Sequence, residues 1–201
     1  MRIAGGKWTG RHLTSPPDRR VRPTAEHVRE AWLKLVEPDL DGARVLDLFA
    51  GTGALGLEAM SRGARYADFV ENRPASLHAL KANVAALRVR EKTRIFKKDA
   101  LPFAAALNAG AYTIAFADPP YSSRMLDRLV EIWKRTAVSE ILTVEHAHDH
   151  KVPPGGRRHL FDETAVTLYR ARAADLQRGR VNPRPAANAN RPDPDPPRRR
   201  E

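Results

Sequence analysis

The sequence predicts an α/β fold of the Rossmann-like type, with a mainly parallel sheet and helices on both faces. Short apolar runs alternate with segments whose apolar residues recur at helical spacing, which is typical of parallel strands joined by right-handed crossovers. A glycine loop directly follows the first strong apolar run, within Val45–Glu71. Acidic residues stand at the ends of successive runs, where parallel strands open onto one crevice.

Length and charge limit the classes of protein that the chain can belong to. At 201 residues it can form one domain with an appendage or two. The net charge of +11 favours a polyanionic partner such as nucleic acid, although an Arg-rich solvated surface remains the alternative. There is no cysteine, which excludes disulfides and thiolate metal sites. No signal-peptide core or membrane-length apolar run is present, so we expect a soluble, cytoplasmic protein.

Residues 1–23 are rich in glycine and arginine and predict a basic arm. The segment Ile3–Leu13 is interpreted as two short strands around a glycine turn, a hairpin or extended arm with an exposed Trp8. Cationic side chains can bind the phosphates of RNA, and an aromatic ring can stack on its bases, so we interpret the arm as an RNA contact. The alternative is a disordered N-terminus. The candidate RNA-binding residues are Arg2, Lys7, Trp8, Arg11 and Arg22.

A helix is predicted to start at Pro23-Thr24, with Thr24 as its N-cap and an apolar face between Val28 and Val36. We expect this helix to pack over the end of the sheet that binds the cofactor. Trp32 is assigned to the core, and Arg29 to the solvated surface.

The segment from Val45 to Glu71 predicts a strand, a glycine loop, a helix and a second strand. Gly51 and Gly53 let the backbone approach a ligand at a helix N-terminus, and Glu71 suits ribose hydroxyls. The same pattern fits a dinucleotide-binding dehydrogenase. A pyrophosphate site would gain nothing from the negative charge of Asp47, which stands just before the loop. A carboxylate at this position suits a cationic ligand, such as the amino-acid end of S-adenosylmethionine.

Further along, a helix is predicted with Pro74 in its first turn, followed by a strand over residues 93–98. That strand ends at Asp99 and Ala100, which would line the same crevice as Gly51 and Glu71, at the place where an adenine would lie. Asp99 could instead cap the helix that follows.

A fourth strand, Tyr112–Ala117, runs into Asp118-Pro119-Pro120-Tyr121. Two prolines with fixed φ and no N–H hold a rigid kink, which exposes the Asp118 carboxylate and the Pro119 carbonyl as acceptors beside the Tyr121 ring. Such a site fits a planar exocyclic amine and aligns its lone pair with a sulfonium methyl group. In isolation the tetrapeptide could be a plain turn. Its place after the glycine loop favours a catalytic role for all four residues.

The remaining segments complete the sheet. A fifth strand is predicted over Ile141–Glu145, and residues 159–161 and 165–169 are predicted to form a final antiparallel pair. From Ala174 the composition becomes Arg-, Pro- and Asn-rich, which predicts a disordered tail over 174–201 that is either inert or weakly attracted to RNA.

The reaction as interpreted requires no metal, and we expect no functional metal site. His146, His148 and His150 form a His-x-His-x-His run that we place in a loop.

The motifs together resemble the RsmD family, which methylates the N2 amine of a guanine in small-subunit (16S) ribosomal RNA. The resemblance spans Arg2 to about Arg172 and rests on RIAGGKWTGR (2–11), RPT (22–24), VREA (28–31), LDLFAGTGALGLEA (46–59) and DPPY (118–121). It implies a class I methyltransferase fold over residues 24–173 with an N-terminal β-hairpin arm over 1–23. It also implies S-adenosyl-L-methionine as cofactor and 16S rRNA as partner, within a small subunit or an assembly intermediate. We expect a monomer.

The resemblance assigns roles to single residues. The segment Arg2–Arg11 would recognise RNA, and family members often carry Phe where Tyr121 stands, a ring that stacks equally well. The cofactor would be held by Thr24 over the pocket, Asp47, Gly51 and Gly53 at the methionine part, Glu71 at the ribose, and Asp99 and Ala100 at the adenine. The guanine would be held by Asp118, Pro119, Pro120 and Tyr121.

Three other functions fit part of the pattern. An adenine-N6 or cytosine-N4 DNA methyltransferase would use the same Asp118 chemistry on duplex DNA. A dehydrogenase would bind a dinucleotide at the Gly51 loop. A non-catalytic RNA-binding module would bind RNA with strong salt dependence but indifferently to Asp118→Ala.

Overall fold

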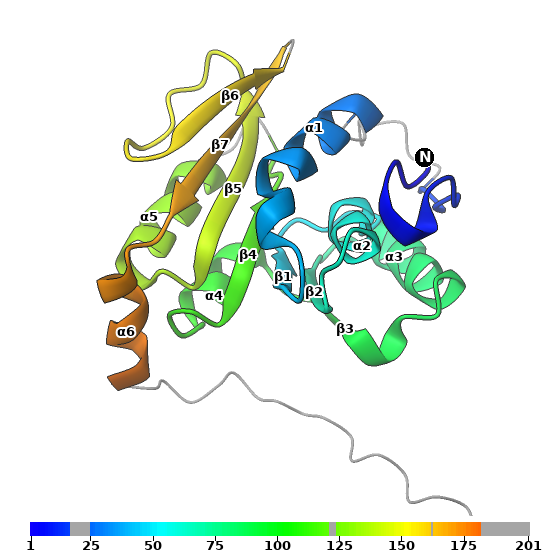
Figure 1. The fold of residues 1–201 in the computed structure, drawn as a ribbon, viewed down its shortest axis with the longest axis horizontal. Helices are drawn as coiled ribbons and strands as arrows, with labels where there is room; N and C mark the ends of the chain where they lie inside the picture. The colour runs from blue at the N-terminus through cyan, green and yellow to red at the C-terminus, as the bar shows by residue number, and fades with distance from the viewer. Residues whose placement is uncertain (17–24, 121–123, 162, 182–201) are drawn as a thin grey trace, which may run out of the picture.

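The structure, a computed structural model, describes residues 1–16, 25–120, 124–161 and 163–181. One seven-stranded sheet runs in the order β3-β2-β1-β4-β5-β7-β6 (Figure 1). The strands are β1 Arg44–Asp47, β2 Tyr66–Val70, β3 Thr93–Phe96, β4 Tyr112–Ala117, β5 Ser139–Ala147, β6 Arg157–Phe161 and β7 Thr164–Arg170. Strands β1 to β5 pair in parallel, and β7 lies antiparallel between β5 and β6. The predicted Rossmann-like α/β fold is confirmed.

Helices cover both faces of the sheet, as predicted. They are α1 Glu26–Val36, α2 Ala54–Ser61, α3 Pro74–Ala86, α4 Ala100–Ala105, α5 Met125–Thr136 and α6 Ala173–Val181, with short 3₁₀ turns η1 Gly6–Trp8, η2 Glu37–Asp39 and η3 Arg90–Lys92. Helices α1, α2 and α3 pack on one face, whereas α4 and α5 pack on the other (Figure 1). Each of the two faces therefore buries its own apolar core.

Each of the two cores contains a buried tryptophan. On the first face, Trp32 of α1 is fully buried and meets Phe116 of β4 edge-on, with ring centroids 5.9 Å apart. On the second face, Trp133 of α5 lies 6.0 Å from Tyr169 of β7. Because burying one large apolar side chain contributes about 1.5–3 kcal/mol, these rings help fix the helices on the sheet. The assignment of Trp32 to the core is confirmed.

Arg29 is buried, so its predicted place on the solvated surface is wrong. Its Nε donates to Glu58 Oε2 at 2.8 Å, and its guanidinium also donates to the carbonyl of Arg2 at 2.6 Å. Glu58, itself buried, accepts a second bond from Arg62 at 2.9 Å. A charge is tolerated in the interior only when it is paired and hydrogen-bonded. Arg29 thus ties α1 to α2 and to the N-terminal segment, through partners that helical periodicity could not reveal.

The N-terminal residues fold back as a hairpin-shaped loop instead of two regular strands. Main-chain bonds join Ile3 N to Arg11 O at 3.0 Å and Gly10 N to Ile3 O at 2.8 Å. One isolated antiparallel bridge links Arg2 and His12, and the turn η1 forms the tip. With so few paired residues the segment stays a loop, which we call the N-terminal loop (residues 1–16).

This N-terminal loop is packed against the body, which corrects the expected extended arm with an exposed Trp8. Ile3 and Leu13 are buried in the first core, and Trp8 is partly buried against it. The amide of Trp8 donates to Ser61 Oγ at 2.9 Å. At Gly6 φ is +81°, and a Cβ there would collide with the Ser61 backbone. The glycines predicted to form a turn therefore also allow close packing on α2.

Strand β5 is longer than predicted, because its pairing with β7 continues to Ala147↔Thr164. His146 lies inside this strand and is buried, with its Nε2 2.8 Å from Thr167 Oγ1. Its placement in a loop is wrong. Burial lowers the pKa of His146, so the ring stays neutral at pH 7. No group of three His, Asp or Glu side chains within the described ranges is arranged to hold a metal ion.

Helix α6, Ala173–Val181, extends into the segment predicted as a disordered tail. The predicted start of that tail at residue 174 is therefore wrong. The first turn of α6 is stabilised by Arg172 Nε, which donates to Asp175 Oδ2 at 2.9 Å. Residues 182–201 lie outside the described residues. None of the described helices is long and apolar enough to span a membrane.

Candidate active site

The strand ends singled out by their sequence meet at one cleft. Strand order reverses between β1 and β4, which pair at Asp47↔Phe116, and α/β sheets bind ligands at such a switch point. A cleft of about 1430 Å³ opens there. The predicted site residues that line it are Asp47, Gly51, Glu71, Asp99, Ala100, Asp118, Pro119 and Pro120. Three other predicted residues, Thr24, Tyr121 and Arg22, lie outside the described residues.

The glycine loop turns sharply after β1. The N–H of Gly53 donates to the Ala50 carbonyl at 2.6 Å, and Gly51 and Gly53 have φ of +53° and +78°. A Cβ on Gly51 would meet nothing within 4 Å, so the backbone there faces open cleft. A Cβ on Gly53 would collide with Leu80 of α3. Gly53 is not among the described residues that line the cleft, and helix packing accounts for its lack of a side chain.

Asp47 is a buried carboxylate at the floor of the cleft. It is 3% exposed, and its Oδ2 accepts the N–H of Gly56 at 3.1 Å. Burial raises the pKa of Asp47 to about 7, helped by the nearby Glu71 charge and opposed by the Gly56 hydrogen bond. A cation placed beside Asp47 would stabilise its charged form, so the position favours a positively charged ligand group.

Glu71, at the end of β2, is held in place almost wholly by the main chain. Its Oε2 accepts the N–H of Gly51 at 2.8 Å, and its Oε1 accepts those of Asn72 and Arg73 at 2.9 and 2.8 Å. The Arg73 guanidinium adds a partly exposed ion pair at 3.3 Å. These bonds fix the carboxylate against the glycine loop, where a ribose diol could replace some of its present donors.

Asp99 stands at the N-cap of α4 but makes no side-chain bond to that helix. It accepts a bond from Asn72 Nδ2 at 2.5 Å instead. The Asp99 side chain therefore does not cap α4. Asn72 joins the ends of β2 and β3 and places Asp99 at the rim of the cleft.

Asp118 follows β4 directly, and its strand is fixed beside the glycine loop because Leu48 N donates to Phe116 O at 3.0 Å. Pro119 is buried and Pro120 exposed, so the chain turns outward at this point. Asp118 is half-buried and lines the cleft. The predicted acceptor and the predicted glycine loop thus face the same space.

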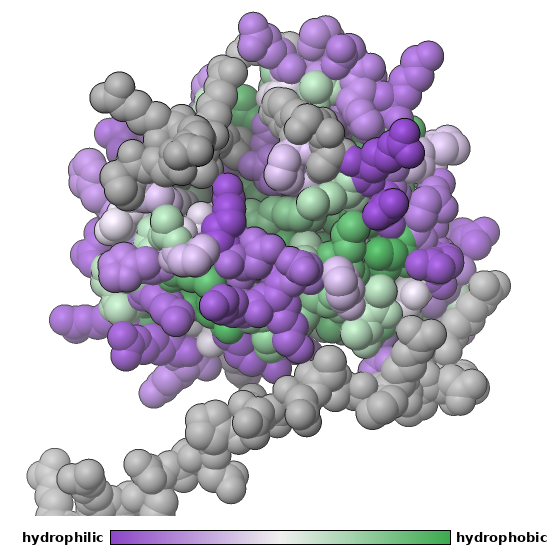
Figure 2. All heavy atoms as spheres, turned by 180° about the vertical axis from the view of Figure 1, so that it is seen from behind, coloured by the Kyte–Doolittle hydropathy of each residue, from purple (hydrophilic) through white to green (hydrophobic). Residues whose placement is uncertain are grey.

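The cleft is acidic although the protein as a whole is basic. Six carboxylates stand among its described lining residues: Asp47, Glu71, Asp99, Asp118, Glu145 and Glu163. The guanidinium and ammonium groups among them belong to Arg29, Arg73 and Lys98, and Arg29 is neutralised by Glu58. Acceptors therefore prevail, which fits a cationic cofactor such as S-adenosylmethionine and a base that presents N–H groups. The volume exceeds that of a usual small-molecule pocket and leaves room for both. Figure 2 shows the molecule from the side opposite to Figure 1, with a mainly hydrophilic surface around a more apolar central area.

Comparison with known proteins identifies the family. Residues 1–163 match the family described as conserved hypothetical protein 95. The ribosomal RNA small subunit methyltransferase D of Escherichia coli strain K12 is 37% identical over 182 residues, covering 86% of this chain and 91% of that protein. The chain belongs to the RsmD family. The putative rRNA methyltransferase YlbH of Bacillus subtilis is 30% identical over 183 residues, covering 86% of this chain and 100% of its own.

Solved structures agree with this family assignment. The putative methyltransferase yhhF from Escherichia coli superimposes with a TM-score of 0.74 at 32% identity, covering 86% of this chain and 98% of its own. A Thermus thermophilus 16S rRNA N2 G1207 methyltransferase, solved with AdoMet and guanosine, has a TM-score of 0.61 at 21% identity, covering 78% of this chain and 45% of its own. The second likeness shows a shared fold.

Part of the cleft was missed from sequence. The end of β5 contributes Glu145 and the start of β7 contributes Thr164, and the Thr164 hydroxyl lies 2.9 Å from Glu145 Oε1. The sequence held a signal for Glu145, because this acid ends an apolar run as Glu71 does. It was not chosen as a site residue because it lies in none of the motifs that resemble the RsmD family. His148 and Phe161 line the same part.

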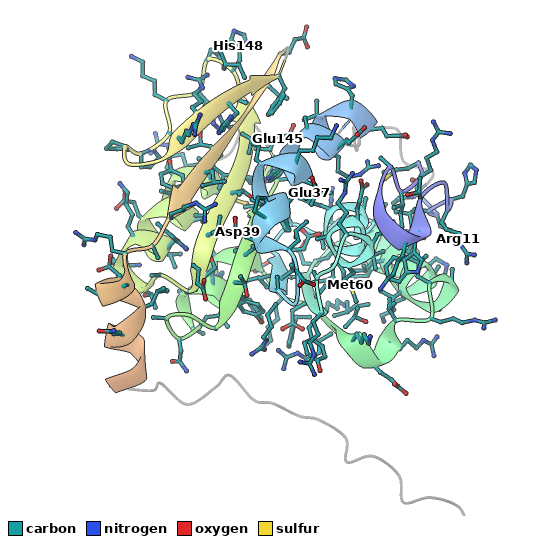
Figure 3. All side chains as sticks on the ribbon, viewed as in Figure 1. Arg11, Glu37, Asp39, Met60, Glu145 and His148 are labelled. Carbon is teal, nitrogen blue, oxygen red and sulfur yellow. The ribbon has the colours of Figure 1, made fainter. Side chains whose placement is uncertain are left out.

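The described RNA candidates lie together on the N-terminal loop. Arg2, Lys7 and Arg11 are exposed, and Lys7 Nζ lies 4.4 Å from the centre of the Trp8 ring. Met1 lines the cleft, so the loop begins at the mouth of the site. Figure 3 shows Arg11 on this loop, well apart from Glu145 and His148 at the β5 end.

Proposed function

We propose that the protein is an S-adenosylmethionine-dependent methyltransferase that modifies the exocyclic N2 amine of a guanine in small-subunit (16S) rRNA. The observation that carries the proposal is the shared cleft. Asp118 and Pro119 at the end of β4 face the same space as Gly51 and Glu71. An amine acceptor site and a nucleoside-binding unit in one cleft are what methyl transfer to a base requires.

The relatives support the substrate class. Two of them are named rRNA methyltransferases, and the one from Escherichia coli is named for the small subunit. The fold relative from Thermus thermophilus is named an N2 guanine methyltransferase.

When bound, S-adenosylmethionine supplies an electrophilic methyl group on a sulfonium. In our proposal Asp47 and the Gly51 backbone hold its methionine part, Glu71 holds the ribose, and Asp99 with Ala100 lies at the adenine. Gly53 shapes the loop, and Thr24 is assigned to the closing segment. Gly51 has no Cβ in the way, and Glu71 is already oriented by main-chain donors.

At the acceptor end, the Asp118 carboxylate and the Pro119 carbonyl accept the two N–H groups of the guanine N2 amine. This orients the nitrogen lone pair, which is otherwise delocalised into the ring, towards the methyl carbon. Tyr121 stacks on the base, and Pro120 fixes the turn. Asp118 or solvent would take the proton that the amine loses on methylation. Alignment provides most of the acceleration.

The N-terminal loop is proposed as the RNA contact. Arg2, Lys7 and Arg11 supply exposed cations on the loop that begins at the cleft with Met1, and Trp8 supplies a ring held under Lys7. Arg22 and the basic segment beyond residue 181 would add further attraction. We further propose that the substrate is a small subunit or an assembly intermediate, and that the protein acts in the cytoplasm as a monomer.

The test is transfer of labelled methyl from S-adenosylmethionine to small ribosomal subunits prepared from cells that lack this protein, followed by nucleoside analysis. We expect N2-methylguanosine at a single position. Label on adenine or cytosine would reject the assigned base, and transfer to duplex DNA instead of rRNA would reject the substrate. Bound cofactor without any transfer would indicate a binding module.

A further inference from the structure

A strongly basic surface lies along one edge of the sheet, outside the N-terminal loop. Strand β3 stands at the end of the strand order, and within the described sheet it pairs with β2 alone. Residues 88–98 contain one acid, Glu91, and six cationic side chains, all of them exposed. The six are Arg88, Arg90, Lys92, Arg94, Lys97 and Lys98. We call these six residues the β3-edge surface.

The β3-edge surface reaches the cleft at one end and the N-terminal loop at the other. Lys98 follows β3 and lines the cleft. From there β3 leads back, at about 3.3 Å per residue, to η3 at the opposite edge of the sheet. Arg88 precedes η3 and follows the end of α3, where Arg11 of the N-terminal loop donates to the Ala86 carbonyl at 3.3 Å. The two sets of cations are therefore neighbours, and Figure 1 shows the N-terminal loop, α3 and β3 on the same side of the molecule.

Most charges of the β3-edge surface are not neutralised by the rest of the described structure. Among the described residues, Arg94 is the one of the six that forms an ion pair, and its Nε donates to Asp68 Oδ1 at 2.9 Å. Asp68 also accepts the Tyr112 hydroxyl at 2.7 Å, so this pair belongs to the packing of the sheet. The other five like charges repel one another, and a bound polyanion would relieve that repulsion.

Arg88 is held in a backbone conformation that favours glycine. Its φ is +56°, in the left-handed region, directly after α3. The N–H of Val89 donates to the Val84 carbonyl at 3.2 Å. The N–H of Arg88 donates to the Ala85 carbonyl at 3.0 Å. These two bonds form the motif that commonly ends a helix with glycine at this position, because a side chain there strains the backbone.

The fold alone gives little reason for a cation at Arg88. A positive charge is favourable near the C-terminus of a helix, but the last turn of α3 contains no basic residue, although a cation there would avoid the strain. Charges on an edge strand also prevent pairing with other sheets, which accounts for Arg94 and Lys97. It does not account for Arg88 or for the cations of η3, which precede the strand.

We propose that the β3-edge surface is a second RNA-binding surface, which holds phosphates of the substrate rRNA next to the nucleotide that enters the cleft. The proposal rests on the proposed function and adds a path for the RNA, from the N-terminal loop past the end of α3 and along β3 to Lys98. Lysine and arginine contacts to phosphates position a nucleic acid without reading its sequence. The surface therefore supplies affinity and orientation, and the choice of base stays with the cleft.

The first test removes three charges that lie away from the cleft, by the combined substitutions Arg90→Gln, Lys92→Gln and Lys97→Gln. The matched control is Arg128→Gln, Lys134→Gln and Arg135→Gln on the exposed face of α5, which lowers the net charge by the same amount. Filter binding over a salt series measures the Kd for small subunits from cells that lack this protein, and for their protein-free rRNA. Calorimetry measures the Kd for S-adenosylmethionine.

For the β3-edge variant we expect the Kd for both RNA substrates to rise about tenfold at physiological salt. The slope of log K against log salt should fall by about 2, because three phosphate contacts are lost. Turnover at saturating subunits and cofactor affinity should stay within about twofold of wild type. The control should bind RNA within about twofold of wild type, although it has the same net charge.

Three results would overturn the proposal. One is an equal loss of RNA affinity in the β3-edge variant and the control, which would reflect net charge alone. Another is a loss of cofactor affinity, which would mean that these residues support the fold. The third is a loss with subunits but not with protein-free rRNA, which would assign the surface to a ribosomal protein. Absence of methyl transfer by the wild type would instead reject the proposed function.

Arg88→Gly separates the fold from RNA binding at a single residue. Since glycine relieves the strained conformation, the midpoint of thermal unfolding should equal or exceed that of wild type. The Kd for rRNA should nevertheless rise about twofold, because one phosphate contact is lost. A lower midpoint with unchanged RNA affinity would show that Arg88 serves the fold and would contradict the proposal.

Discussion

The two halves of the cleft hold their carboxylates by different means. In the half formed by β1, β2 and β3, Asp47 and Glu71 accept main-chain N–H groups, from Gly56 and Gly51 among others. In the half formed by β4, β5 and β7, Glu145 is held by the side-chain hydroxyl of Thr164. After the roles proposed for them above, we call these the cofactor half and the acceptor half.

This difference has a functional meaning. Main-chain donors hold Asp47 and Glu71, so these two acids need only the backbone of the glycine loop and of the turn after β2. Asp99 at the rim is the exception in this half, because the Asn72 side chain holds it. The acceptor half depends on side-chain partners, which can change with the substrate. If the division is correct, changes in the cofactor half should alter cofactor affinity, and changes in the acceptor half should alter turnover and choice of base.

The largest effect is expected at Asp118. Asp118→Asn removes the charged acceptor but keeps the shape, so kcat should fall about 10³-fold while the Kd for S-adenosylmethionine stays within about twofold. Single-turnover transfer and calorimetry measure the two quantities. A parallel loss of cofactor affinity would break the division between the halves. Asp41→Asn, an exposed position in the turn before β1, is the control.

At Glu71 the opposite pattern is expected. Glu71→Gln weakens a charged acceptor for the ribose, so the Kd for S-adenosylmethionine should rise about 50-fold, and kcat at saturating cofactor should stay within about threefold. Isothermal titration and steady-state kinetics check this. An unchanged Kd would show that the ribose does not bind there. Glu91→Gln, exposed in η3, controls for the change of charge.

The buried Asp47 should make stability depend on pH. Since its pKa is raised to about 7 from the ordinary 3.8, the folded chain keeps a proton that the unfolded chain has already lost between about pH 4 and pH 7. This contribution to stability is complete below pH 4 and is lost as the pH rises to 7. We therefore expect Asp47→Asn to gain about 4 kcal/mol in free energy of unfolding relative to wild type at pH 8, and nothing at pH 4. Urea denaturation of both proteins at pH 4 and pH 8 measures this difference. An equal gain in free energy of unfolding at the two pH values would contradict the raised pKa of Asp47.

The smallest effect concerns the N-terminal loop. Reversing the charge at Arg2, Lys7 and Arg11 should weaken rRNA binding about tenfold at physiological salt and lower the slope of log K against log salt by about 2, with cofactor affinity retained. Filter binding over a salt series measures both. Loss of cofactor affinity would show that the loop supports the fold instead. The control is the same reversal on the exposed face of α5, at Arg128, Lys134 and Arg135.

The cleft positions of the glycine loop, of the two acids beside it and of Asp118 could be predicted from sequence because their signals are local. The glycine loop, Asp47 and Glu71 lie within one strand-helix-strand unit, and Asp118 follows an apolar strand directly. Periodicity likewise placed Trp32 in the core. These features depend on neighbouring residues, so a single segment carries the information.

The features that were missed depend on partners from distant segments. Arg29 has the helical spacing of the buried face, because it stands three and seven residues before Trp32 and Val36. Its charge led to the surface assignment, and only the fold brings Glu58 beside it. Glu145 becomes a site residue only when β7 supplies Thr164 and β4 supplies Asp118. His146 was placed in a loop because nothing local shows that β7 extends β5. Such side-chain pairings depend on which strands are neighbours and on how their residues line up. The sequence predicts the order of helices and strands but not the register between strands.

The division of the cleft is tested most directly by a crystal structure of the full chain with S-adenosylhomocysteine and guanosine. We expect ribose hydroxyls on Glu71 and the guanine N2 within hydrogen-bond distance of Asp118 and the Pro119 carbonyl. A guanine bound in the cofactor half, or with its amine directed away from Asp118, would contradict it.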